Sequence, residues 1–85
     1  MVTVYVLQGK HKRYVGITNN LNRRLAEHRS GHTKSAQVIG QFKLLHTEKF
    51  PDHISARKRE KFLKSGQGRE FLNQLYPATG PASGG

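Results

Sequence analysis

Two tyrosines near the N-terminus have the spacing of neighbours in a β-hairpin. Tyr5 lies in "TVYVLQG" and Tyr14 in "RYVG", with a short basic stretch between the two segments. If Gly9 and Lys10 form a two-residue turn, antiparallel pairing places Tyr5 directly opposite Tyr14, and opposed residues project from the same face. The spacing therefore predicts two phenols side by side on one face of a sheet. An ordinary cross-strand aromatic contact, worth roughly 0.2 to 1 kcal/mol, is the alternative explanation.

A second group of chemically useful side chains follows in residues 18–31, "TNNLNRRLAEHRSG". Leu21 and Leu25 are four residues apart, as on the packed face of a helix. Arg24 and His28 lie together with these two leucines inside an arc of about 100°. We therefore expect both on the packing side of the helix rather than on the solvent face with Glu27. A charged group there needs a partner, although an extended arginine and a half-buried histidine would also fit.

A carboxylate occupies a similar position in residues 55–66, "SARKREKFLKSG". Glu60 is one of only five acids in the chain, and it shares a helical stripe with Ala56 and Leu63. One explanation is an ion pair with a nearby cation: Arg57, Lys61 or Lys64. The other is that this inward carboxylate holds a divalent cation. Two phenols, an arginine, a histidine and a glutamate directed at one sheet face could assemble a metal-assisted phosphodiester hydrolase.

The charge of the chain indicates a polyanionic partner. Fifteen Lys and Arg against five Asp and Glu give a formal net charge of +10, and the isoelectric point is near 10.6. Such an imbalance raises self-repulsion, and nucleic acid is the commonest polyanion that would offset it. An anionic membrane surface is the rival partner, but the sequence has no long amphipathic helix with a bulky apolar face.

Several classes of protein are disfavoured by composition. The absence of cysteine excludes disulfides and cysteine-ligated zinc. No apolar run approaches the ~20 residues of a membrane span, and the N-terminal segment lacks the features of a signal peptide. We therefore expect a cytoplasmic, nucleoid-associated protein that does not associate with membranes.

The elements that must position these side chains follow from the same patterns. Strands are predicted over residues 2–8, with one well-buried face, and over 11–17 and 41–50. Helices are predicted over 18–31 and 55–66, with Asp52 or Ser55 capping the second, and a short helix within 67–77. Residues 32–40 are expected to be a connection. The order β-β-α-β-α-α predicts a small α+β domain with a three-stranded, mainly antiparallel sheet flanked by helices. We expect residues 1–77 to form this domain and 78–85 to be a disordered tail or a cloning remnant.

Four segments, in this order, resemble the GIY-YIG nuclease domain of homing endonucleases, some restriction enzymes and the incising subunit of bacterial nucleotide excision repair. They are "TVY" (3–5), "YVG" (14–16), "NNLNRRLAEH" (19–28) and "ARKREKFLKSG" (56–66). The chain is most similar to compact single-domain bacterial members. It departs from the family name at Thr3, which replaces glycine, and at Val4 and Val15, which replace isoleucine.

The resemblance implies a divalent-metal-dependent endonuclease acting on DNA, with DNA repair among the implied roles. By resemblance, Glu60 binds Mg²⁺ or Mn²⁺, and Arg24 neutralises charge on the phosphoryl oxygens in the transition state. Tyr5 activates or orients the attacking water with His28 as proton acceptor, while Tyr14 positions water or phosphate. Asn73 is the candidate counterpart of a C-terminal asparagine that some members carry near the site.

The remaining basic residues suggest how nucleic acid is held. Five of them are predicted to contact phosphates without reading sequence, with a solvated surface as the alternative: Lys10, Lys12, Arg13, Arg23 and Arg29. No recognition domain is apparent, so specificity is expected to come from DNA structure or a protein partner. His32, His46 and His53 show no metal-ligand spacing and receive no role.

Two other hypotheses remain open. One is a catalytically weak or inactive nucleic-acid-binding module on the same scaffold. The other is a small RNA-binding protein that uses only its basic surface, which would leave the inward Glu60 and Arg24 unexplained.

Overall fold

Three antiparallel strands and three helices make up residues 1–9, 12–30 and 42–76, the part of the chain that the computed structural model describes. The strand order is β2 (Arg13–Thr18), β1 (Val2–Gly9), β3 (Phe42–Phe50). The helices are α1 (Leu21–Arg29), α3 (His53–Lys64) and α4 (Gly66–Leu75). The predicted β-β-α-β-α-α order and the α+β class are confirmed. The predicted connection 32–40 and tail 78–85 lie outside the described residues.

Each helix starts where a side chain can accept a hydrogen bond from a free backbone N–H. Asn20 accepts from the Arg23 amide at the start of α1, and Asp52 accepts from the Ser55 amide at the start of α3. Of the two capping residues considered for α3, Asp52 is the one used. Ser65 ends α3 and caps α4, where its hydroxyl accepts from the amide of Gly68. No helix among the described residues is long and apolar enough to cross a membrane.

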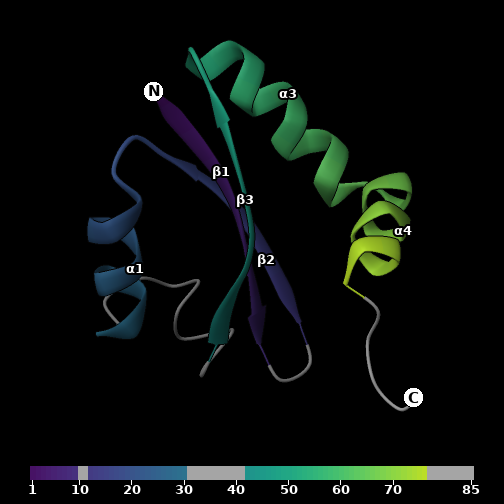
Figure 1. The fold of residues 1–85 in the computed structure, drawn as a ribbon, viewed down its shortest axis with the longest axis horizontal. Helices are drawn as coiled ribbons and strands as arrows, with labels where there is room; N and C mark the ends of the chain where they lie inside the picture. The colour runs from purple at the N-terminus through teal and green to yellow at the C-terminus, as the bar shows by residue number, and fades with distance from the viewer. Residues whose placement is uncertain (10–11, 31–41, 77–85) are drawn as a thin grey trace.

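The sheet separates two helical layers, with α1 on one side and α3 and α4 on the other (Figure 1). Val2, Val4 and Val6 of β1 pack with Ala56 and Leu63 of α3 and with α4. On the other face, Tyr5 and Leu7 pack with Leu25 of α1. The expectation of a single buried face on this strand is therefore wrong. The first strand is central in the sheet, and both of its faces are covered because α1 packs on one and α3 and α4 pack on the other.

The hairpin register differs from the prediction. Tyr5 pairs with Gly16 and Leu7 pairs with Tyr14, and the Gly9 amide donates to the Lys12 carbonyl at 2.8 Å. The turn is therefore one residue farther along the chain than predicted, and each pairing shifts by two. Because side chains alternate with a period of two, a shift of two leaves every side chain on its predicted face.

A polar network joins β3 to α3 and α4. His46 hydrogen-bonds through Nδ1 to the Tyr76 hydroxyl and through Nε2 to Glu48, both at 2.7 Å. Arg59 donates to both oxygens of Glu48, at 2.7 and 3.1 Å. Its guanidinium carbon also lies 4.8 Å from the Phe62 ring centre and 4.9 Å from that of Phe71. These residues tie the far edge of the sheet to both helices on that face.

Candidate active site

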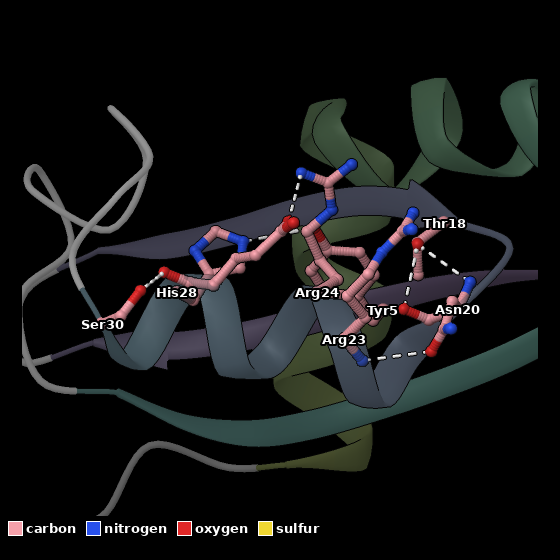
Figure 2. A network of polar contacts seen from close by, with 8 residues as sticks. Tyr5, Thr18, Asn20, Arg23, Arg24, His28 and Ser30 are labelled. Carbon is pink, nitrogen blue, oxygen red and sulfur yellow. Dashed lines mark hydrogen bonds and ion pairs between the residues drawn. The ribbon is translucent and has the colours of Figure 1, made fainter.

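Three aromatic rings meet on the α1 face of the sheet. The ring centres of Tyr5 and Tyr14 are 6.1 Å apart, and that of His28 is 6.1 Å from Tyr5 and 5.4 Å from Tyr14. The Tyr5 hydroxyl is 3.3 Å from His28 Nε2, and Figure 2 shows it reaching this ring beside Arg24. The predicted proximity of the two phenols on one face is confirmed, as is the position of His28 on the packing side of α1. Tyr5 and His28 are only 1% and 3% exposed.

Gly16 makes room for the Tyr5 ring. A Cβ atom at this position would lie 2.6 Å from the Tyr5 hydroxyl oxygen and 3.0 Å from Tyr14 Cε2. A strand glycine often marks a place where another group must approach the backbone closely. The glycine of the "YVG" segment therefore has a steric role, which allows the phenol to cross β2.

Burial sets the protonation states of the hydrogen-bonded pair. Burial, followed by Tyr14, raises the pKa of the Tyr5 phenol above its ordinary value; Glu60 adds to this effect and Arg24 opposes it. Burial, followed by Arg24, lowers the pKa of His28. The phenol therefore keeps its proton and the imidazole is neutral near pH 7, so we infer that the phenol donates to Nε2.

Arg24 lies at the rim of the ring cluster. Its guanidinium is 3.3 Å from Glu27, and the side chains are 37% and 41% exposed. The expectation that Arg24 lies on the packing side, away from Glu27, is therefore only half correct. A helix places residues three apart close enough to pair, and this exposed pair leaves the guanidinium accessible to a solvent-borne anion.

Glu60 approaches from the other helical layer. Helix α3, which carries Glu60, packs on the face of the sheet opposite α1, so Glu60 comes from a different helical layer from Arg24 and His28. The charge of Glu60 adds to the rise in the pKa of Tyr5, and α3 contacts the edge strand β2. The side chain is 17% exposed and accepts from Lys64 Nζ at 3.0 Å, so the predicted ion-pair partner is Lys64.

The donor set around Glu60 suits a hard cation with few protein ligands. No group of three or more His, Cys, Asp or Glu residues among those described could hold a metal ion. Mg²⁺ is often bound by one or two carboxylates while it keeps several waters. A single, partly exposed carboxylate therefore fits Mg²⁺ or Mn²⁺, and it does not fit an ion that requires a full protein cage.

The predicted phosphate contacts are distributed unevenly. Lys12, Arg23 and Arg29 are exposed, whereas Lys10 lies outside the described residues. Arg13 instead donates to Gln8 Oε1 at 2.7 Å and to Asn73 Oδ1 at 2.8 Å. The tie between Arg13 and Asn73 joins residues 60 positions apart, and no local pattern predicts it. It places Asn73 next to the hairpin.

Comparisons with known proteins agree with this arrangement. Residues 1–73 match the family model described as the GIY-YIG catalytic domain. The chain is 39% identical over 64 residues to a UPF0213 protein of Natronomonas pharaonis, covering 73% of this chain and 75% of that protein. It is 32% identical to the UPF0213 protein of Bacillus halodurans, whose solution NMR structure superposes with a TM-score of 0.55 over 92% of this chain and 88% of the other. Because the family model spans most of the sequence, this chain belongs to the GIY-YIG family.

Proposed function

We propose that this protein is a divalent-metal-dependent endonuclease that hydrolyses phosphodiester bonds in DNA. The observation that carries the proposal is the hydrogen bond between the buried Tyr5 phenol and neutral His28, beside the accessible Arg24. Family membership supports it, because GIY-YIG domains are typically nucleases. The net charge of +10 suits a polyanionic substrate, and we place its action in the cytoplasm, at the nucleoid.

The protonation states suggest how the roles are divided. With its pKa raised, Tyr5 is a poor base, so it orients the attacking water and passes a proton along its hydrogen bond. His28 is neutral and accepts that proton at Nε2. Tyr14, which contacts both rings, positions the water or the phosphate.

The charged groups stabilise the reacting phosphate. The planar guanidinium of Arg24 can bind two phosphoryl oxygens in place of Glu27, with which it now forms an exposed ion pair. Glu60 would hold Mg²⁺ or Mn²⁺, which when bound polarises the phosphate and stabilises the leaving oxygen. Lys64 pairs with Glu60 and holds its carboxylate in place.

The exposed cations on the hairpin and on α1 would bind the DNA backbone. Lys12, Arg23 and Arg29 are placed for such contacts, with Lys10 and Arg13 as further candidates. Phosphate contacts do not read sequence. We therefore propose that specificity comes from DNA structure or from a protein partner.

A Glu60→Ala variant tests the proposal. Incubation with single-stranded, duplex, flapped and branched DNA, with and without Mn²⁺, should show metal-dependent nicking by the wild type and none by the variant. DNA binding should stay equal or become slightly tighter, because a negative charge is removed. The melting temperature should change little, because the Lys64 partner is 54% exposed.

Glu70→Ala is the matched control, because it removes an exposed acid from α4 with the same change in net charge. It should nick DNA at the wild-type rate. A Glu60→Ala variant that nicks DNA at near the wild-type rate would show that Glu60 is not the metal ligand and would refute this mechanism.

A nucleic-acid-binding module with little or no activity is the second candidate function. The observation that favours it is that both key charges have protein partners, Arg24 with Glu27 and Glu60 with Lys64. Salt-sensitive binding by a wild type that nicks none of the DNA forms with Mn²⁺ would support this function over the nuclease.

A further inference from the structure

Helix α3 carries a basic face that the functions assigned above leave unused. Arg57, Lys58 and Lys61 are exposed, and they form no ion pair or side-chain hydrogen bond within the part of the chain that the structure describes. A hollow of about 230 Å³ lies on this face, and it is lined by His53, Ile54, Arg57, Lys58 and Lys61. The uncompensated charge is therefore concentrated at a concave surface.

Part of this face lies on the same side of α3 as Glu60. At about 100° per residue, Arg57 and Lys61 lie about 60° and 100° around the helix from Glu60, and Lys58 lies about 160° from it. Arg59 lies on the opposite flank, where Glu48 and two phenylalanines hold it. The helix thus uses Arg59 for structure and presents Arg57 and Lys61 on the side of the candidate site's carboxylate.

We propose that this α3 basic face, made of Arg57, Lys58 and Lys61, binds the phosphate backbone of DNA. The substrate then crosses the β2 edge of the sheet, with α1 on one side and α3 on the other. The proposal rests on the proposed function, and it adds the element that holds the second half of the substrate. The phosphate contacts predicted from the sequence all lie on the hairpin and on α1.

Charge favours a nucleic-acid backbone as the occupant, because Arg57, Lys58 and Lys61 present three positive charges that pair with no carboxylate among the described residues. Among the described residues of α3, Ile54 is the only large apolar residue that is exposed, at 72%. One such side chain gives little apolar area for insertion into a membrane surface.

The test compares two double variants that each remove two positive charges. Arg57→Ala with Lys61→Ala alters the α3 basic face, and Lys43→Ala with Lys49→Ala removes two exposed lysines from β3, the opposite edge of the sheet. Dissociation constants for a labelled duplex are measured at several salt concentrations, together with melting temperatures. Losing two phosphate contacts should weaken binding about 30-fold at 0.15 M salt and reduce the salt slope by about 1.8. The β3 variant should bind within about threefold of wild type, because its lysines lie outside the proposed path.

Two outcomes would overturn the inference. Equal losses in both double variants would mean that only net charge matters. Wild-type affinity in the α3 variant would mean that DNA does not touch this face, and that another partner, such as an acidic protein, is the better occupant. Mn²⁺-dependent nicking is followed in parallel, and a wild type that binds DNA but does not nick it counts against the proposed activity alone.

Discussion

Replacing Gly16 with alanine tests whether Tyr5 is held where the candidate site needs it. A Cβ atom there would lie 2.6 Å from the Tyr5 hydroxyl oxygen and 2.7 Å from Cζ of the same ring. An ordinary carbon contact begins near 3.4 Å, so the phenol must move by about 0.8 Å. Tyr5 is 1% exposed and belongs to a core cluster with Leu7 and Leu25, so the ring can move only by displacing buried neighbours.

Both stability and activity should fall. Overpacking of this kind costs roughly 1 to 3 kcal/mol, and each kcal/mol lowers the melting temperature of a domain this size by about 4 to 8 °C. We expect a decrease of about 10 °C. A displacement of about 1 Å at a reacting group can cost about 100-fold in rate, so nicking by the folded variant should fall by that order.

The assay is thermal unfolding followed by circular dichroism, combined with Mn²⁺-dependent nicking at a temperature where the variant is folded. Gly66→Ala is the matched control, because a Cβ atom there meets nothing within 4 Å. It should melt at or slightly above the wild-type temperature. If Gly16→Ala melts and nicks like the wild type, the close packing of Tyr5 on Gly16 is refuted. A lower melting temperature with unchanged nicking would keep the packing but remove Tyr5 from the reaction.

Three further predictions follow from the charges and the glycines. Because burial lowers the pKa of His28 in the folded protein, the unfolded chain takes up a proton first as the pH falls below about 6.5. The stability that is present above this pH should therefore be lost as the pH falls toward the lower pKa of the folded state. His28→Gln should flatten that part of the curve of melting temperature against pH. Glu48→Ala should destabilise by roughly 1 to 3 kcal/mol, measured by urea unfolding, because it leaves Arg59 and His46 without their carboxylate, whereas the exposed Glu70→Ala should change stability little. Gly68→Ala should unfold the C-terminal half of the domain, visible as lost helical signal, because its Cβ atom would overlap the Phe62 carbonyl oxygen, which is backbone and cannot give way.

The sequence by itself was sufficient to predict the order of the elements and the sheet face on which each hairpin side chain lies. Alternation in β1 depends on local geometry, so Tyr5 and Tyr14 share a face even though the predicted pairing was wrong by two. The helical positions of Leu25 and His28 were predictable for the same reason, because a period of 3.6 residues fixes which side chains point inward.

The tertiary structure determined the features that the periodicity of a single strand or helix cannot specify. The packing of α3 and α4 on the side of the sheet opposite α1 buried both faces of the first strand. Glu60 therefore belongs to the helical layer opposite α1, and its position on a helical stripe could not show which layer that was. Contacts between distant residues, such as Arg13 with Asn73 and His46 with Tyr76, depend on how the packed layers meet, and that geometry exists only once the whole core has formed.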